Sequence, residues 1–301
     1  MASDSPMNVL RTPESRFDSL LDFPFAPHYH EVAPGLRLHY VDEGSRDAAP
    51  VLMLHGEPTW SYLYRHMIPP VVAAGLRVLA PDLIGFGRSD KLVAPGDYSY
   101  AGQVAWLRTW LEALDLRDVT LVCQDWGSLI GLRLAAESPQ RFARIVLSNG
   151  GLPTGHGPIP GVFRAWRAFS RYSPWFPIGR IVQSATRRRL KMAELAAYEA
   201  PFPSASYKAA ARIYPSLVPI TPNDPASEAN RRAWQVFSQW NKPFICCYSD
   251  GDPITRGLDR AFRDRVPGAR GQPHMTLCGG HFIQEDDPRT FARLVVDACR
   301  A

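Results

Sequence analysis

The stretch LVCQDWGSLIGL, residues 121–132, joins an apolar strand pattern to a helix pattern and places an aspartate at the junction. The small residues Cys123 and Gly127 flank this aspartate, Asp125. A sharp strand-to-helix turn of this kind exposes the side chain at its tip, which is commonly a nucleophilic serine. The stretch therefore predicts a strained turn that presents a carboxylate in place of the usual hydroxyl.

The rest of the chain repeats a strand-and-helix rhythm around this turn. Short apolar runs alternate with amphipathic segments, which is typical of a mostly parallel sheet flanked by crossover helices. We expect strands at Leu36–Val41, Val51–Leu54, Arg77–Ala80, Val119–Cys123, Arg144–Ser148, Phe244–Tyr248 and Met275–Leu277. We expect helices at Tyr62–Ala74, Tyr100–Leu114, Ser128–Ser138, Leu258–Arg265 and Arg289–Cys299. The predicted fold class is α/β.

The rhythm breaks at the turn-forming stretch GGLPTGHGPIPG, residues 150–161, and resumes near Trp240. A helix-rich tract lies between these points. We expect residues 152–226 to form a helical cap inserted after the sixth strand. Residues 1–151 and 227–301 would then form the core domain.

The composition is that of an ordinary globular protein. Hydrophobic residues make up 46% of the 301 residues and charged residues 21%, which argues against a disordered or fibrous chain. The net charge of +5 is modest, and the basic run Arg187–Arg189 falls in a helical pattern, so we interpret it as a solvated helix face. Neither a signal segment nor an apolar run of membrane-spanning length is present. We expect a soluble, cytoplasmic monomer or homodimer that binds neither nucleic acid nor membrane.

The cysteines and histidines favour neither disulfides nor a metal site. Three of the five cysteines fall within or at the ends of predicted strands, at Cys123, Cys246 and Cys247. We interpret the cysteines as buried thiols. His274, Cys278 and His281 alone do not form a zinc pattern, because no paired Cys-x-x-Cys accompanies them. We therefore expect no metal.

An aspartate at the tip of the turn implies a particular chemistry. A serine there needs a general base before it can attack, whereas aspartate is already ionised. Its carboxylate can displace a leaving group from an sp3 carbon and leave an alkyl ester on the enzyme, and water must then cleave that ester. The simpler alternative is that Asp125 is a helix N-cap, a position that aspartate favours.

A histidine and an acid for the second step follow later in the chain. His281 lies in LCGGHFIQED, residues 277–286, after the last predicted strand, and nucleophile, acid and histidine then occur in the chain order known for such enzymes. The acid would hold the imidazole in one tautomer and stabilise its cation. Two candidates follow the preceding strand, Asp250 and Asp252, and we favour Asp252 because it lies further along the turn.

Backbone and indole N–H groups supply the remaining candidates. Gly56 allows the backbone N–H of Glu57 to point at the reacting group, and the backbone N–H of Trp126 would complete an oxyanion hole. The indole N–H of Trp126 is also a donor for a departing anion. Either Trp166 or Trp175, in FRAWRAFSRYSPWF, could supply a second indole. Two such bonds would favour the transition state over the neutral ground state.

Five motifs together closely resemble the haloalkane dehalogenases, a family with the α/β-hydrolase fold. The resemblance is to the branch that holds the halide with two tryptophans and places its acid after the seventh strand, and it covers nearly the whole chain from about residue 8. The motifs are HGEPTWSYLYR (55–65), APDLIGFGRSDK (80–91), CQDWGSLIG (123–131), YEAPFPSASYKA (198–209) and GGHFIQED (279–286).

The resemblance implies a role for each matching residue. It makes Asp125 the nucleophile, His281 the base and Asp252 its partner acid. It places the oxyanion donors at Glu57 and Trp126, the halide donors at Trp126 and Trp166, and implies no cofactor. Asn149 stands where another branch of the family has its acid. The substrate would be a small haloalkane, with water as second reactant and halide ion as product, and Phe163 and Leu129 are candidate pocket residues.

Three other functions compete with this interpretation. Epoxide hydrolases share the fold and the aspartate turn, and the predicted cap contains tyrosines that could protonate an epoxide oxygen, although Glu57 in HGEP matches the dehalogenases better. An esterase is disfavoured because the chain lacks a G-x-S-x-G motif. A non-catalytic binding protein is compatible with the fold, but it leaves Asp125, Asp252 and His281 unexplained.

Overall fold

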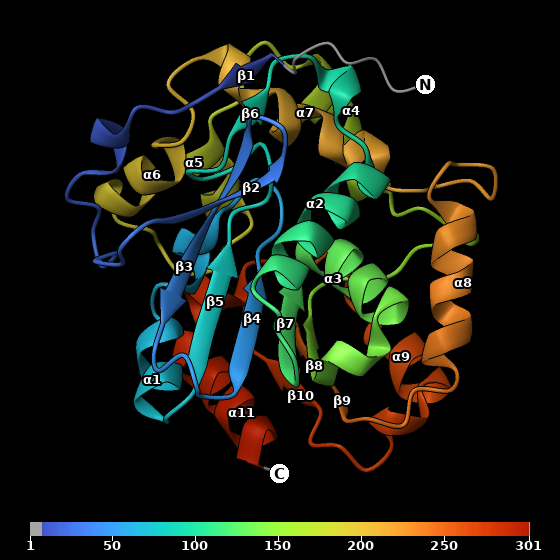
Figure 1. The fold of residues 1–301 in the computed structure, drawn as a ribbon. Helices are drawn as coiled ribbons and strands as arrows, with labels where there is room; N and C mark the ends of the chain where they lie inside the picture. The colour runs from blue at the N-terminus through green and yellow to red at the C-terminus, as the bar shows by residue number, and fades with distance from the viewer. Residues whose placement is uncertain (1–7, 301) are drawn as a thin grey trace.

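A mostly parallel sheet of eight strands forms the centre of the computed structural model, which describes residues 8–300 (Figure 1). Its strands are β2 (His28–Ala33), β3 (Leu36–Glu43), β4 (Pro50–Leu54), β5 (Arg77–Pro81), β7 (Val119–Gln124), β8 (Phe142–Ser148), β9 (Phe244–Ser249) and β10 (Met275–Leu277). They are ordered β10-β9-β8-β7-β4-β5-β3-β2, and β3 runs opposite to the other seven strands. A separate antiparallel pair joins β1 (Val9–Leu10) to β6 (Lys91–Leu92).

The α/β fold expected from the sequence is confirmed, and all seven expected strands are present. In the main sheet, the strand that the sequence analysis missed is β2, at the edge; outside it, the two-residue strands β1 and β6 were also missed. The sequence of β2, HYHEVA, is polar and mostly half-buried, so it lacks the apolar run that marks the central strands. The central strands β4 and β7 are almost fully buried, as expected where helices cover both faces of a sheet.

Helices cover both faces of the sheet (Figure 1). One group, in which α2 contacts α3 and α3 contacts α8, comprises α2 (Tyr100–Ala113), α3 (Trp126–Glu137) and α8 (Ser227–Phe237). Another pair packs together, α1 (Ile68–Ala73) and α11 (Pro288–Arg300). Two shorter helices are α9 (Asp259–Arg265) and α10 (Ile283–Asp286). Single 3₁₀ turns lie at Glu14–Phe17, Ser61–Tyr64, Pro95–Asp97, Pro139–Arg141, Ala205–Lys208 and Pro267–Ala269.

The expected helix at Tyr62–Ala74 is divided in the structure. A 3₁₀ turn ends at Tyr64, and α1 begins only at Ile68. Pro69 and Pro70 explain the new start, because proline has no backbone N–H to donate and is tolerated in the first turn of a helix but not in its interior.

The helical segment expected as a cap follows β8, the sixth strand of the main sheet in chain order, and lies beyond one end of the strands (Figure 1). Its helices are α4 (Gly161–Tyr172), α5 (Ile178–Ser184), α6 (Met192–Glu199) and α7 (Ala209–Leu217). The domain boundaries at residues 152 and 226 remain a prediction. No helix among residues 8–300 is long and apolar enough to cross a membrane.

Two expectations about single segments are wrong. Arg187–Arg189 lies in the loop between α5 and α6, outside any helix, because the backbone N–H groups of Arg187 and Arg188 bind the carboxylate of Asp286. All five cysteines are free thiols, but they are not all buried: Cys278 is exposed beyond the end of β10.

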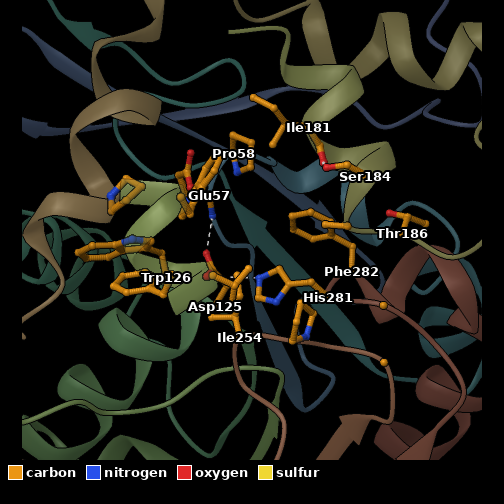
Figure 2. Close-up of a pocket in the computed structure, with 18 of the residues that line it drawn as sticks. Glu57, Pro58, Asp125, Trp126, Ile181, Ser184, Thr186, Ile254, His281 and Phe282 are labelled. Atoms are coloured by element: carbon orange, nitrogen blue, oxygen red, sulfur yellow. Dashed lines mark hydrogen bonds and ion pairs between the residues drawn. The ribbon is translucent and has the colours of Figure 1, made fainter. Parts of the chain in front are cut away.

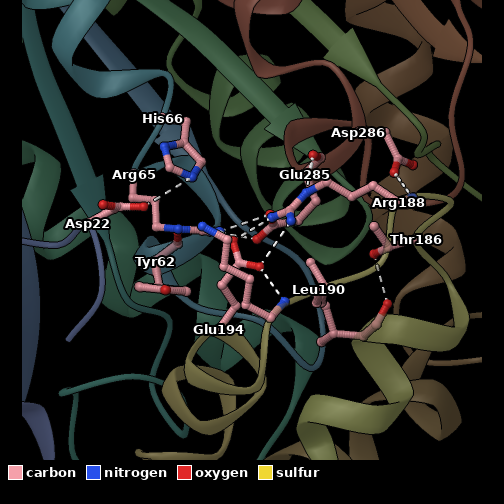
Figure 3. Close-up of polar contacts among 12 residues, drawn as sticks. Asp22, Tyr62, Arg65, His66, Thr186, Arg188, Leu190, Glu194, Glu285 and Asp286 are labelled. Carbon is pink, nitrogen blue, oxygen red and sulfur yellow. Dashed lines mark hydrogen bonds and ion pairs between the residues drawn. The ribbon is translucent and has the colours of Figure 1, made fainter.

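A buried group of charges joins the cap to the core, and we call it the ion cluster (Figure 3). Its members are Arg65 from the core, Arg188, Glu194 and Tyr198 from the cap, and Glu285 from α10. The Arg65 guanidinium lies 2.8 Å from Glu194 Oε1 and 2.5 Å from Glu285 Oε1. Arg188 also donates to both acids, so each carboxylate has two guanidinium partners.

Candidate active site

Asp125 occupies a strained turn between β7 and α3. Its φ of 50° and ψ of −125° place a non-glycine residue where side chains are rarely found. The strain is maintained by close packing on both sides. A Cβ on Gly127 would lie 2.1 Å from the carbonyl oxygen of Leu54, and one on Gly56 would lie 2.4 Å from Asp125 Oδ1. Both positions therefore require glycine.

The Asp125 side chain points into a cavity and does not cap α3. Although Asp125 stands at the N-cap position, its carboxylate accepts no capping hydrogen bond. Instead, Asp125 Oδ1 accepts the backbone N–H of Glu57 at 2.7 Å. Asp125 Oδ2 lies 3.4 Å from His281 Nε2 (Figure 2). The structure thus brings these three predicted site residues together from loops after three different strands.

His281 is held from its other side by Asp252. His281 Nδ1 lies 2.8 Å from Asp252 Oδ2, and Asp252 is fully buried. Asp252 also accepts the backbone N–H of Ile254 at 2.9 Å and the hydroxyl of Thr255. The rival acid, Asp250, is exposed and pairs with Arg187 at 3.3 Å. The geometry therefore places Asp252, and not Asp250, against the imidazole.

The two acids strongly favour the imidazolium form of His281. Burial opposes its charge, but the Asp252 carboxylate and the hydrogen bond to Asp125 outweigh burial and raise the pKa of His281 to about 10. Burial likewise opposes ionisation of Asp252, yet the charge and hydrogen bond of His281 lower the pKa of Asp252 to about 2. The resting site therefore holds an acid–imidazolium–acid arrangement.

Three further residues position the His281 loop, a role that the sequence analysis gave to none of them. The Asn149 amide donates to the carbonyl oxygens of Gly280 and His281 at 3.0 and 2.9 Å, so Asn149 braces this loop. From the cap, the carbonyl of Ala185 accepts the backbone N–H of His281 at 2.7 Å. The Gln124 amide donates to the carbonyl oxygen of His281 at 3.3 Å. Of these, the sequence analysis named Asn149 only as the position where another branch of the family has its acid, and Gln124 adjoins the nucleophile in the chain.

A cavity of about 390 Å³ lies over Asp125 and His281, between core and cap. Its wall includes all the remaining predicted site residues: Glu57, Trp126, Leu129, Phe163 and Trp166. A second cavity, of about 380 Å³, is lined by the 150–160 loop and meets the first at Asp125, Leu129 and Phe163. The reacting carboxylate therefore borders both spaces.

The two candidate cap tryptophans lie in different surroundings. Trp166 is half-buried in α4 and lines the cavity. Its ring packs against those of Phe169 and Phe176, each 5.8 Å away between ring centroids. Trp175 is 60% exposed, and Arg180 covers its ring. Trp126 is buried and packs 4.6 Å from Tyr214. The geometry therefore brings Trp166, and not Trp175, to the cavity that contains Trp126.

Comparison with known proteins decides the family. The α/β hydrolase fold family model matches residues 49–288. A haloalkane dehalogenase from Mycobacterium marinum is 53% identical over 294 residues, which are 96% of this chain and 99% of the relative. One from Psychrobacter cryohalolentis is 54% identical, covering 96% of this chain and 97% of the relative. The chain belongs to the haloalkane dehalogenases.

A solved structure agrees with this assignment. The haloalkane dehalogenase DpaA from Paraglaciecola agarilytica NO2, solved as a tetramer, is 33% identical with a TM-score of 0.90 and covers 98% of this chain. As a haloalkane dehalogenase, the chain is a hydrolase that converts haloalkanes to an alcohol and a halide ion. Among residues 8–300, no group of three or more His, Cys, Asp or Glu side chains could hold a metal.

Proposed function

We propose that dehalogenation in this enzyme is carried out by Asp125 as nucleophile, His281 as general base and Asp252 as its orienting acid. We call these three residues with Glu57 the catalytic group. The observation that supports the assignment is the placement of the Asp125 carboxylate in the cavity, with the Glu57 N–H at 2.7 Å and His281 Nε2 at 3.4 Å. The substrate is a small haloalkane, because the cavity of about 390 Å³ is lined mainly by apolar side chains.

In the first step, a carboxylate oxygen of Asp125 bonds to the carbon that bears the halogen. The carbon–halogen bond breaks and the halide leaves with the electron pair. Trp126 and Trp166 line the same cavity, so their indole N–H groups stabilise the charge that develops on the halide. The product of this step is an alkyl ester at Asp125.

Formation of the ester prepares His281 for the second step. The hydrogen bond to Asp125 and its charge both raise the pKa of His281 in the resting site. Esterification removes that negative charge, so the pKa of His281 falls and the imidazole can act as a neutral base. Asp252 keeps a proton on Nδ1, which leaves Nε2 free to accept one from water.

Water then attacks the carbonyl carbon of the ester. His281 takes the proton from the water, and the backbone N–H groups of Glu57 and Trp126 stabilise the tetrahedral oxyanion. Collapse of this intermediate transfers the proton to the departing alkoxide, which leaves as the alcohol. The second proton of the water remains on the Asp125 carboxyl group and passes to the neutral His281, which restores the carboxylate beside the imidazolium.

A variant that lacks the base separates the two steps. His281→Phe exposed to dibromoethane should release about one bromide per enzyme and gain the mass of one bromoethyl group, read by intact-protein mass spectrometry. Asp125→Ala is the control and should gain no mass. If His281→Phe also stays unmodified while it remains folded, the two-step assignment is wrong.

The alternative of an epoxide hydrolase is tested by activity. Halide release from a panel of bromoalkanes should be measured beside diol formation from a panel of epoxides. We expect turnover of the bromoalkanes alone. A monomeric or homodimeric state and a cytoplasmic location stay predictions from the sequence.

A further inference from the structure

Glu57 carries a side chain that the proposed chemistry does not use. The proposed chemistry uses its backbone N–H, which donates to Asp125 Oδ1. The side chain nevertheless lines the cavity, in a residue that is only 5% exposed, and Figure 2 shows Glu57 across from Asp125. Its Oε1 atom is buried with no hydrogen-bond partner among the described residues. Because buried acids are usually paired, an unpaired one inside the reaction cavity calls for a physical explanation.

The surroundings of Glu57 strongly disfavour its charge. Burial and the neighbouring Asp125 carboxylate raise the pKa of Glu57 well above its usual range. His281 and the indole N–H of Trp166 act in the opposite direction but do not outweigh them. Trp166 is the same indole that faces the departing halide in the proposed function, so the carboxyl group and the halide lie close to one donor.

A count of the charges shows why the protonation state of Glu57 affects the binding of an anion in the cavity. Asp125 and Asp252 are opposed by one imidazolium, His281, so the resting site has an excess of one negative charge. Ionised Glu57 would increase that excess, and a halide ion would add to it again. Arg187 also lines the cavity, but its side chain is half exposed and pairs with Asp250, so it offsets little of this charge.

We propose that the Glu57 carboxyl group must hold a proton for the cavity to bind halide tightly, so that Glu57 couples halide affinity to pH. The inference rests on the proposed function, because it takes the cavity of Trp126 and Trp166 as the halide site. Ionised Glu57 would accept the Trp166 N–H and repel the anion. Neutral Glu57 leaves that N–H for the halide.

The sign of the coupling follows from linkage. Halide favours the protonated form, so halide affinity is full below the pKa of Glu57 and falls as pH rises through it. By reciprocity, halide binding above that pKa takes up a proton from solution. Three other charged or titratable groups line this cavity: Asp125, His281 and Arg187. Asp252 lies behind His281, and the charge of Glu57 acts on the Tyr214 hydroxyl. His281 alone would also weaken halide binding at alkaline pH, so a comparison of variants must isolate Glu57.

Glu57→Gln provides that comparison, because the amide matches the neutral acid in size and keeps the backbone N–H. Bromide dissociation constants should be measured by tryptophan fluorescence from mildly acidic to alkaline pH at constant ionic strength. We expect the wild-type constant to rise with pH, approaching about tenfold per pH unit for one linked proton. Glu57→Gln should stay flat until His281 loses its proton. Asp250→Asn, an exposed acid near the rim, should follow the wild type.

A second measurement detects the proton directly. On bromide addition in weakly buffered alkaline solution, the wild type should take up close to one proton per bromide, and Glu57→Gln should take up markedly fewer. Equal pH slopes and equal proton uptake in the two proteins would overturn the inference. So would a folded Glu57→Gln that fails to bind bromide at acidic pH. If the wild type itself gives no bromide response at any pH, the halide site of the proposed function fails, and this inference fails with it.

Discussion

The molecule contains two buried groups of charges that differ in balance. In the ion cluster, both acids face two guanidinium groups, and Tyr198 donates a further hydrogen bond to Glu285. In the catalytic group, three acids face one imidazole, and one carboxyl oxygen of Glu57 has no partner among the described residues. The first group is compensated and the second is not.

The difference shows that one group of charges attaches the cap to the core, whereas the other takes part in the proposed reaction. Compensated charges have little tendency to exchange protons, so the ion cluster fixes the cap against α10. Uncompensated charges respond to any change of charge beside them, which the proposed chemistry requires of His281. The two groups are adjacent in sequence, since Glu285 follows His281 by only four residues, and the cap residue Ala185 binds the His281 backbone. The compensated group thereby orients the reactive one.

Removal of the nucleophile should have the largest effect. Asp125→Ala eliminates the only atoms proposed to bond to substrate, so we expect bromide release to fall by about 10⁴-fold or more. The thermal midpoint should stay within a few degrees of the parent or rise, because the substitution also removes one uncompensated negative charge. Bromide release at the parent rate by pure, folded Asp125→Ala would end the proposed mechanism.

Disruption of the ion cluster should have the second largest effect, and this effect should be on the stability of the fold. Glu285→Ala leaves Arg65 buried with one acid in place of two, and we expect a loss of about 3–5 kcal/mol in the free energy of unfolding, measured by urea denaturation. Glu228→Ala is the matched control, since Glu228 pairs with Arg231 and Arg232 on the surface of α8. Its free energy of unfolding should stay close to that of the wild type, because exposed ion pairs contribute little. Equal losses in the two variants would show that the cluster does not hold the cap.

The dependence of the free energy of unfolding on acidic pH should also reflect the ion cluster. Burial opposes ionisation of Glu194, but hydrogen bonds from Arg188 and the backbone of Lys191 lower the pKa of Glu194 from 4.5 to about 2. Because the folded pKa is depressed, this stabilisation is present above about pH 4.5 and is lost as pH falls toward 2.

Each pKa unit corresponds to about 1.4 kcal/mol, and solvent screening reduces the effect, so we expect a contribution of about 2 kcal/mol. Glu194→Gln has no carboxyl group to titrate at this position. Between neutral and acidic pH, its free energy of unfolding should therefore fall by about 2 kcal/mol less than that of the wild type. If the wild type and Glu194→Gln give parallel curves of unfolding free energy against pH, Glu194 does not contribute to the acid sensitivity of the protein.

The sequence predicted which candidate catalytic residues come together better than it predicted the residues that support them, for physical reasons. Asp125 and His281 are flanked by glycines and strand ends, which leave a local signal in the chain. The seven apolar strands likewise leave a local signal, because each is a short apolar run in the sequence. The edge strand β2 was missed because its polar residues give no apolar run. Arg188 looked like a helical surface residue, although its partners Glu194 and Glu285 can be identified only from the folded structure.

Choices between neighbouring candidates also needed three-dimensional contacts. Asp250 and Asp252 lie two residues apart in the same turn, and only burial and the 2.8 Å contact with His281 separate them. The Glu57 side chain gave no signal of its own, because its surroundings come from distant segments that carry Asp125 and Trp166. Pattern and spacing predict elements and motifs, but not the electrostatic environment of a single carboxyl group.

The smallest effect that we expect distinguishes the two cap tryptophans. Trp166→Phe keeps the aromatic stack but removes one N–H from the cavity, so bromide should bind about tenfold more weakly, a loss of about 1.5 kcal/mol. Trp175→Phe alters an exposed ring and should leave the bromide dissociation constant unchanged. Tryptophan fluorescence titrations measure both. If Trp175→Phe weakens bromide binding and Trp166→Phe does not, Trp175 must replace Trp166 as the second halide donor. The set of N–H groups that stabilise an anion in the cavity then changes as well.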